Sequence, residues 1–436
     1  DNEKKMLDLF LKFMEDTDPD LIVGWNVMNF DMRYLVNRLN NLNMNYNRLS
    51  PFKRVKADKY GVETKGRVIF DLLTAYIIYN FKDEESFTLD FIASKELGKK
   101  KVVYVGKIAD MWMKDFDKLV EYNAMDVELV KGIDEKLALI DLFDEIRRMS
   151  KCLFDGVFQK SKIADGYLLQ KYRGRFALPV QTKQKITQEI SGARVLPPKK
   201  GISEWVATID VKSLYPNNIV SANMDALTKN ENGDIDLGNG IRFNSQPKGM
   251  FPGIMEGLFI DRQKYKKEMK KYEYKSDMYN LMDRKQYSIK VLSNSFYGLV
   301  ASPEFRLYDY EIAGSITYLG RKINEWMEKT VEGLGYEVVA GHTDSIHFKL
   351  NPEKFPGKEG EDLVRCLVVD AKEVTEKVNK SFDDFAKQFN IKNHTWAVEF
   401  EKLAQTAIFI EKPRYAMRLR WVNGRGDFEG GSLVDQ

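Results

Sequence analysis

The sequence predicts a multidomain protein of the α+β class, which contains both helices and strands. Three observations predict this class. Residues 1–150 alternate short apolar segments with segments of helical periodicity. Residues 261–299 form two long charged stretches that are typical of helices. Residues 336–350 alternate apolar and polar side chains on both sides of a turn, which is the pattern of an antiparallel hairpin.

Length and composition bound the possibilities. The chain has 436 residues, which at roughly 150 residues per domain suggests about three structural units. It is 43% hydrophobic and 31% charged, which is typical of a globular protein with a sizeable core. No run of about 18 apolar residues occurs, so we expect no transmembrane helix and no membrane partner. Cys152 and Cys366 stand far apart without paired His or Cys residues, which favours a reducing, intracellular setting.

The first half of the chain begins as an α/β unit. Residues 21–25 and 68–70 are predicted to be short buried strands, and residues 117–149 carry apolar positions at helical spacing. A turn-rich boundary is expected at 190–201, because glycine and proline are concentrated there. A hydrophobic strand is predicted at 206–211, and residues 228–253, rich in Gly and Asn, are expected to be a surface loop.

The second half is predicted to be helical at first. Charged helices are expected at 261–278 and 279–299, and a third helix at 309–333 with Gly335 as its C-cap. The hairpin follows, with Asp344 at its tip. A helix at 361–389 and strands near 397–410 and 414–421 complete the chain.

Positive charge is concentrated in the stretch from Arg262 to Lys290. Ten Lys and Arg residues stand there against four Asp and Glu, so the stretch carries a charge of +6. Such a stretch could neutralise phosphate groups. The alternative is the solvated face of a charged helix.

Two acids, Asp210 and Asp344, are the first candidates for a catalytic site. Asp210 closes a hydrophobic strand and Asp344 occupies the hairpin tip. Carboxylates that emerge from adjacent strands can hold two magnesium ions, one of which activates an attacking hydroxyl while the other holds a leaving phosphate. The alternative for each acid by itself is an ordinary turn or N-cap residue.

The sequence around these acids resembles the family B DNA polymerases. Residues 210–216 (DVKSLYP) resemble motif A, DxxSLYP; residues 290–298 (KVLSNSFYG) resemble motif B, KxxxNSxYG; residues 341–345 (GHTDS) resemble motif C, YxDTDS. The three occur in the order of that family. Further likenesses lie at 317–321 (TYLGR), at 412–416 (KPRYA) and, more weakly, at 190–193 (ISGA).

The resemblance implies templated addition of deoxynucleotides to a primer 3′ end, with two Mg²⁺ ions as cofactors and Mn²⁺ as the alternative. The metal ligands it implies are Asp210, Asp344 and the backbone of Val211. The deoxynucleotide (dNTP) contacts it implies are Arg262, Lys266, Lys290, Asn294, Ser213, Leu214 and Tyr215. The DNA or base-pair contacts it implies are Tyr297, Gly298, Thr343, Arg321, Lys412, Arg414 and Tyr415.

Helical spacing supports the nucleotide site. Lys290, Asn294 and Tyr297 are at positions i, i+4 and i+7, so they share one helix face, and Arg262 and Lys266 are also four residues apart. Tyr215 resembles the family's steric gate, an aromatic side chain with which the 2′-hydroxyl of a ribonucleotide collides. The alternative for Tyr215 is a core tyrosine.

Two departures from the family pattern stand out. His342 replaces the first acid of the DTD tripeptide, and histidine prefers softer metals than magnesium. Metal preference or turnover is therefore expected to differ. Pro413 stands where a second lysine is usual and removes one contact to DNA. His347 and His394 are expected to be structural.

Residues 1–150 carry a second set of motifs, which resembles DnaQ-like 3′–5′ exonucleases. Residues 26–31 (NVMNFD) resemble Exo II and residues 122–126 (YNAMD) resemble Exo III. The exonuclease residues implied are Asn26, Phe30, Asp31, Tyr122 and Asp126, with Asp31 and Asp126 as metal ligands. No Exo I strand is found, since the acids at positions 1 and 3 lie in no hydrophobic strand, and Asp71 is expected to be structural.

The family resemblance implies a domain order. We expect a partial RNase H-like exonuclease domain at 1–150, a linker with the first part of a ferredoxin-like palm at 151–255, helical fingers at 256–300, the second part of the palm at 301–410, and the start of a thumb at 411–436. The intervals of 80 residues from Asp210 to Lys290 and 54 from Lys290 to Asp344 resemble the compact archaeal arrangement. A prokaryotic or viral origin is favoured, and a nuclear one stays open.

The expected partners are primer–template DNA and dNTPs, with a sliding clamp or a second polypeptide as further candidates. Both ends are expected to be truncated, or the missing parts to be supplied by another chain. Two alternatives remain open. One is a nuclease without synthesis, which the absent Exo I acids disfavour. The other is a catalytically impaired, nucleic-acid-binding homologue, to which only His342 points.

Overall fold

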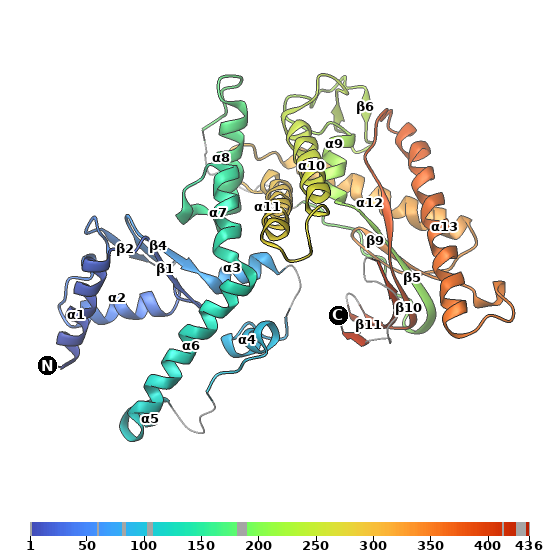
Figure 1. The fold of residues 1–436 in the computed structure, drawn as a ribbon. Helices are drawn as coiled ribbons and strands as arrows, with labels where there is room; N and C mark the ends of the chain where they lie inside the picture. Colours follow the sequence, from blue (N-terminus) through green and yellow to red (C-terminus); the bar gives the residue numbers. More distant parts are fainter. Residues whose placement is uncertain are drawn as a thin grey trace. The chain divides into compact units, whose positions relative to one another are not determined.

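A computed structural model describes residues 2–58, 61–80, 84–102, 108–180, 190–411, 414–423 and 433–435 (Figure 1). The chain divides into two compact units, each built from two segments. Unit 1 comprises residues 1–177 and 265–292, and unit 2 comprises residues 178–264 and 293–436. The two helices α10 and α11, described below, contribute residues to both units.

Unit 1 opens with the helix α1 (Asn2–Thr17), the strand β1 (Leu21–Gly24) and the helix α2 (Asp31–Asn41). A short helix η1 (Tyr46–Leu49) and the hairpin β2 (Val55–Asp58) with β3 (Gly61–Thr64) lead to β4 (Val68–Asp71). β1 and β4 pair in parallel, so both predicted strands are confirmed. The buried Arg67 guanidinium ties this region together by donating to three backbone carbonyls, those of Met14, Pro19 and Leu49.

The rest of unit 1 before α10 and α11 is helical. It contains α3 (Leu72–Tyr79), α4 (Leu89–Leu97), α5 (Ile108–Lys114), α6 (Phe116–Leu137), α7 (Leu139–Ser150), η2 (Phe154–Gly156) and α8 (Lys160–Tyr172). The helical pattern predicted over 117–149 is broken at Ala138, which has φ +50° and ends α6. The Asp134 carboxylate accepts a hydrogen bond from the Ile140 N–H at 3.0 Å and so starts α7. No Gly or Pro marks this break, so periodicity alone did not reveal it.

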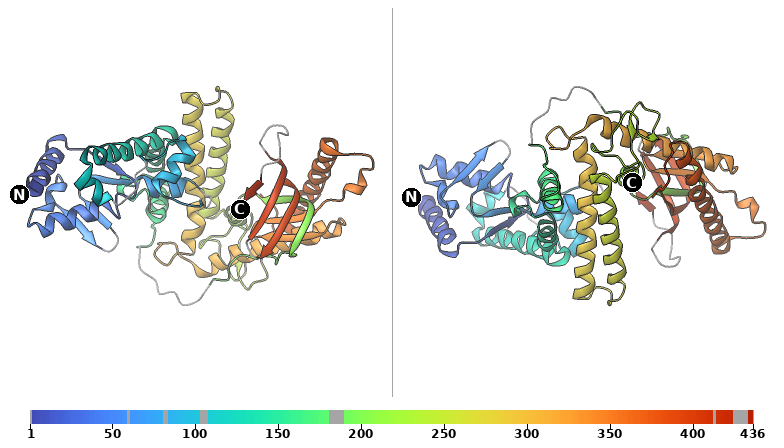
Figure 2. Two further views of the ribbon diagram at one scale, coloured as in Figure 1. Left: turned by 90° about the horizontal axis from the view of Figure 1, so that it is seen from below. Right: turned by 90° about the horizontal axis from the view of Figure 1, so that it is seen from above.

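The centre of unit 2 is a six-stranded antiparallel sheet of order β12-β11-β10-β5-β9-β8. Its strands are β5 (Gly201–Val211), β8 (Val338–His342), β9 (Ser345–Lys349), β10 (Val398–Glu411), β11 (Arg414–Val422) and β12 (Leu433–Asp435). The hairpin with Asp344 between its strands is confirmed, as are the strands predicted at 206–211, near 397–410 and at 414–421. Helices α12 (Tyr310–Gly333) and α13 (Gly360–Lys387) pack against the sheet (Figure 2).

A short helix, α9 (Leu214–Ser221), joins the end of β5 to the rest of unit 2 and packs on α12. The side chain of Asn218 is fully buried at this contact. Its Nδ2 donates to the carbonyl of Ile316 on α12 at 3.0 Å, and its Oδ1 accepts from Trp396 Nε1 at 2.9 Å. One amide therefore links α9 to two segments that are distant in sequence.

Helices α10 (Met250–Met269) and α11 (Asp277–Val300) are the two charged helices. The prediction of a helix at 261–278 was wrong at both ends, because α10 begins eleven residues earlier, within the expected loop, and ends at Met269. The buried carboxylate of Asp225 accepts from the N–H of Phe251 at 2.7 Å and so fixes the first turn. Pro252 is tolerated there, since N–H groups in a first turn have no helical partner. The remaining loop carries the short hairpin β6 (Ile235–Asp236) and β7 (Arg242–Phe243).

We predict that Asn218→Ala lowers the free energy of unfolding by about 1–3 kcal/mol, because it leaves a buried carbonyl and a buried indole N–H without partners. Urea unfolding followed by circular dichroism measures the change. The matched control is Asn232→Ala in an exposed turn, with an expected change within about 0.5 kcal/mol. Equal effects of the two substitutions would contradict the role assigned to Asn218.

Candidate active site

Strand register brings Asp210 and Asp344 to one end of the sheet in unit 2. Asp210 pairs with Ser345 on β9 and with Glu399 on β10, and Ser345 pairs in turn with His342 on β8. Directly paired residues point to the same face of a sheet, so these four side chains form one row across four strands. The N–H of Val211 donates to the carbonyl of Asp344 at 2.8 Å, which ties the hairpin turn to the end of β5.

Electrostatics of this row are unfavourable without a cation. Burial, together with the negative charges of Asp344, Glu401 and Glu399, raises the pKa of Asp210 to about 8. Burial also raises the pKa of Asp344. Lys212 does not pair with either acid but with Glu399, at 2.7 Å. A bound divalent cation would stabilise the charged forms that burial and the neighbouring acids disfavour.

The donor set suits a magnesium ion that a substrate helps to hold. In the described part of the chain, no three His, Cys, Asp or Glu side chains come together as a potential metal site. Asp210 and Asp344 are nevertheless hard oxygen donors, and Mg²⁺ is commonly held by one or two carboxylates with phosphate oxygens and water. The residues present therefore fit a metal site that is completed by a phosphate-bearing ligand.

His342 stands at the end of the same row. Its Nε2 atom is buried and has no hydrogen-bond partner among the described residues. An unpaired buried nitrogen is costly, and such groups call for an explanation. The other two histidines are accounted for: His347 Nδ1 lies 2.8 Å from Thr208 Oγ1, and His394 Nε2 lies 3.1 Å from Asp383 Oδ1. The expectation that these two are structural agrees with their contacts.

The chain turns sharply after β5. Ser213 has φ +48°, a left-handed conformation that is uncommon for a residue other than glycine. This turn starts α9, buries Leu214 and leaves Tyr215 half-buried. The ring of Tyr215 stacks on that of Tyr297 with 4.2 Å between centroids. Burial and the charge of Asp344 raise the pKa of Tyr215, so the predicted gate residue stands beside the acid pair.

Arg321 on α12 joins two of the sequence motifs. Its Nη1 donates to the carbonyls of Ser191 and Gly192 at 3.0 and 2.7 Å. The segment at 190–193 and the segment at 317–321 are thus in contact. In this structure the guanidinium of Arg321 holds the linker, a role that its sequence motif did not indicate.

The predicted nucleotide-binding cations all lie on α10 and α11. Arg262 and Lys266 are one turn apart on α10, and Lys290 lies on α11 with its Nζ 5.3 Å from the ring centroid of Tyr287. Asn294 lies on the same helix, and its side chain is outside the described residues. At Gly298 a Cβ atom would meet nothing within 4 Å, which leaves open space at this face of α11.

Residues predicted near the carboxyl end are only partly described. Lys412 and Pro413 lie outside the described residues. Arg414 is exposed, with its Nη1 3.4 Å from Glu411. Tyr415 is half-buried against the rings of His347 and Phe409. Thr343 lies in the hairpin turn beside Asp344.

The exonuclease-like residues of unit 1 form two separate groups. Asn26 has φ +61°, and the buried Asp71 accepts from its N–H at 3.2 Å and caps α3, so Asp71 is structural as expected. Asp31 begins α2 next to the exposed Phe30, and partial burial raises its pKa.

Tyr122 and Asp126 form the second group, on α6. Lys101 Nζ lies 2.7 Å from Asp126 and 5.3 Å from the ring centroid of Tyr122, so both share one helix face as predicted. Asp126 is therefore already paired with a cation in this structure.

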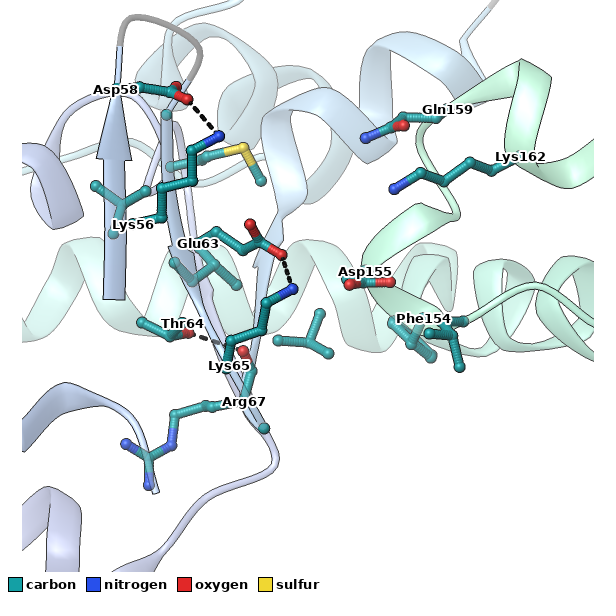
Figure 3. A pocket seen from close by; sticks show the side chains of 17 residues that line it. Lys56, Asp58, Glu63, Thr64, Lys65, Arg67, Phe154, Asp155, Gln159 and Lys162 are labelled. Carbon is teal, nitrogen blue, oxygen red and sulfur yellow. Dashed lines mark hydrogen bonds and ion pairs between the residues drawn. The ribbon is translucent and has the colours of Figure 1, made fainter. Parts of the chain in front are cut away.

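A separate hollow of about 520 Å³ lies between the β2–β3 hairpin and the segment from η2 to α8 (Figure 3). Two of its lysines are paired with acids beside them, Lys56 with Asp58 at 2.9 Å and Lys65 with Glu63. Four of its lining side chains are cationic and three are acidic, and two of the cations are thus neutralised by neighbouring acids. None of the residues predicted to act in catalysis or binding lines it.

Comparison with known proteins identifies the motifs as those of one family. The model of DNA polymerase family B matches residues 148–427, which is more than half of the chain. The chain belongs to the family B DNA polymerases. The model of the exonuclease domain of this family matches residues 1–123.

Curated relatives in this family come from archaea, a bacteriophage and an animal. The DNA polymerase of Pyrococcus glycovorans is 26% identical over 95% of this chain and 53% of its own length. The DNA-directed DNA polymerase of Enterobacteria phage T4 is 25% identical over 93% of this chain and 56% of its own. The DNA polymerase delta catalytic subunit of Drosophila melanogaster is 27% identical, over 95% and 41%. The chain thus spans about half the length of the first two relatives.

As expected from the sequence, none of the helices among the described residues combines the length and the apolar character needed to cross a membrane.

Two acids near the family B catalytic motifs escaped the sequence analysis, Glu399 and Glu401. Both act on the pKa of Asp210, and Glu401 lies at a register shift between Phe400 and Lys402 on β10. Bulges are frequent beside active sites because they redirect side chains. The only signal was an alternation of acidic and apolar residues at 398–402, which is common in strands.

We predict that Asp210→Asn stabilises the metal-free protein at pH 9 but not at pH 5. Because the pKa of Asp210 is raised on folding, the folded state holds a proton that the unfolded state has released between about pH 4 and pH 8, and stability falls as pH rises through this window. The substitution removes that loss. Urea unfolding in a chelating buffer at both pH values measures it.

The matched control is Asp236→Asn. A hydrogen bond from the N–H of Gly238 lowers the pKa of Asp236, so this acid is ionised at both pH values and its substitution should have equal effects at each. A difference between pH 5 and pH 9 that is as large for Asp236→Asn as for Asp210→Asn would contradict the assignment.

Proposed function

We propose that this chain carries the polymerase site of a template-directed DNA polymerase, which adds deoxynucleotides to a primer 3′ end. The observation that supports it most is the juxtaposition of Asp210 and Asp344 at one end of the sheet, both with raised pKa. In the proposed reaction the primer 3′-oxygen forms a bond to the α-phosphorus of the dNTP. The bond from that phosphorus to the β-phosphate oxygen breaks, the 3′-hydroxyl loses its proton, and pyrophosphate leaves.

Asp210, Asp344 and the backbone carbonyl of Val211 are the proposed ligands for two divalent ions. When bound, such ions activate the 3′-hydroxyl and neutralise charge on the leaving phosphates. Arg262, Lys266 and Lys290 are proposed to bind the triphosphate. Their charges would stabilise the pyrophosphate that forms, without a P-loop.

The remaining polymerase contacts are proposed from motif and placement together. Ser213, Leu214, Tyr215 and Asn294 are assigned to the dNTP; Tyr297, Gly298, Thr343, Arg321, Lys412, Arg414 and Tyr415 are assigned to DNA or the nascent base pair. For Arg321 the contact to DNA competes with its hydrogen bonds to Ser191 and Gly192. The open space at Gly298 is consistent with a base pair lying there.

The architecture is proposed to be that of a polymerase palm and fingers. The six-stranded antiparallel sheet with α12 and α13 supports a palm formed by 151–255 and 301–410, and α10 with α11 supports fingers at 256–300. Residues 1–150 would be a partial exonuclease domain of the RNase H-like kind. The described residues of 411–436, where the start of a thumb was expected, would belong to the palm instead, because β11 pairs with β10 and β12 with β11 in the same sheet. Primer–template DNA and dNTPs are the proposed partners, with a clamp or a second polypeptide in addition.

We predict that Asp344→Asn lowers the rate of primer extension by about a thousandfold, since a lost metal ligand removes several kcal/mol of transition-state stabilisation. Single-turnover extension of a labelled primer–template with all four dNTPs measures the rate. Asp236→Asn, which changes a half-buried acid on β6, is the control and should extend at the parent rate. Extension that survives in Asp344→Asn would exclude this site.

We also predict a preference for Mn²⁺ over Mg²⁺ that depends on His342. Imidazole nitrogen binds Mn²⁺ and later transition metals better than Mg²⁺, and Nε2 of His342 is buried without a partner in the row of Asp210. His342→Asp should raise the ratio of Mg²⁺- to Mn²⁺-supported extension by about tenfold, a size usual for groups around a metal. Metal titrations of both proteins measure it, with His394→Gln as the control. An unchanged ratio would leave His342 without a role in metal choice.

A further inference from the structure

Helix α12 passes very close to the Tyr215 side chain, and it does so at a glycine. A Cβ atom at Gly320 would lie 3.1 Å from Cε1 of Tyr215, closer than nearly all real Cβ contacts. It would lie 3.4 Å from Leu214 Cδ2 and 3.5 Å from Asn218 Nδ2, which are ordinary contacts. Among the described residues, the Tyr215 ring is therefore the group that a Cβ atom at Gly320 would crowd.

The Tyr215 ring has little freedom to move away. Its face stacks on Tyr297, with 4.2 Å between centroids and 23° between planes. Helices α9 and α12 are also held together. Buried Asn218 on α9 donates to the carbonyl of Ile316, one turn before Gly320 on α12, and accepts a hydrogen bond from Trp396 Nε1. The ring is thus in contact with Tyr297 and lies against the position that a side chain at residue 320 would occupy.

Other glycines on α12 have no such neighbour. At Gly314 and at Gly333 a Cβ atom would meet nothing within 4 Å. Glycine is unfavourable inside a helix relative to alanine, so each of these positions would gain helix propensity from an alanine. Only at Gly320 does close packing oppose that gain.

We propose that Gly320 is a positioning residue for sugar selection: its lack of a side chain sets where the Tyr215 ring stands against the ribose of an incoming nucleotide. This inference rests on the proposed function, in which Tyr215 excludes a 2′-hydroxyl. A methyl group at position 320 displaces the ring from its seat without removing it. Discrimination between deoxyribonucleotides and ribonucleotides then changes although no group that touches the substrate has been altered.

The first test measures kcat/KM for dCTP and for CTP in primer extension by the full chain, for the parent, Gly320→Ala, Gly314→Ala and Tyr215→Ala. We expect the dCTP/CTP ratio of Gly320→Ala to differ from that of the parent by about tenfold or more, whereas Gly314→Ala stays within about twofold. Tenfold corresponds to about 1.4 kcal/mol in the transition state. Tyr215→Ala should lower the ratio. A parent-like ratio in Gly320→Ala, or in Tyr215→Ala, overturns the inference.

The second test needs no catalysis and so separates this inference from the proposed function. Melting temperatures are measured for Gly320→Ala and Gly314→Ala, each in the parent and in a Tyr215→Ala background. Gly320→Ala should lower Tm by about 2 °C or more in the parent and not in the Tyr215→Ala background, since the crowded ring is then absent. Gly314→Ala should not lower Tm in either. Equal effects of Gly320→Ala in the two backgrounds overturn the seating, even if the parent chain extends no primer.

Discussion

The pairing of β5 with β9 is the interaction on which the placement of Asp210 and Asp344 in unit 2 depends. Antiparallel pairing of β5 with β9, and the hydrogen bond from Val211 to the Asp344 carbonyl, hold the two carboxylates together although burial penalises their charges. The long ladders of β5 with β10 and the packing of α12 and α13 provide the stability that offsets this cost. A site that is electrostatically unfavourable when empty binds cations well, because the cation relieves the repulsion.

The helices beside the acids serve to position side chains. The left-handed Ser213 turns the chain out of β5, and buried Asn218 fixes α9 against α12, so that Tyr215 stands near Asp344. These contacts place strain and buried polar groups next to the site, as is usual where function demands a defined geometry. Family B membership explains the motifs, whereas the packing of α9 on α12 explains how this chain holds them in place.

The acids of unit 1 have other roles than those of unit 2. Its acids are used by the fold itself: Asp71 caps α3 and holds the loop of Asn26, and Asp126 is paired with Lys101. The residues that match the exonuclease domain therefore form a folded α/β structure, while the two candidate metal ligands, Asp31 and Asp126, lie on separate helices.

The sequence by itself determined what depends on neighbours along the chain. The periodicity of strands and helices, the hairpin with Asp344 between its strands, and the order of the motifs were all predicted correctly. Only the tertiary structure decided the break at Ala138, the early start of α10, the nearness of Glu399 and Glu401 to Asp210, and the contact of Gly320 with Tyr215. The last three depend on contacts between segments that are distant in sequence, namely the Asp225 carboxylate at the first turn of α10, the register of β5 with β10, and the packing of α9 on α12. Local propensity carries no information about which distant side chain will fill a given space.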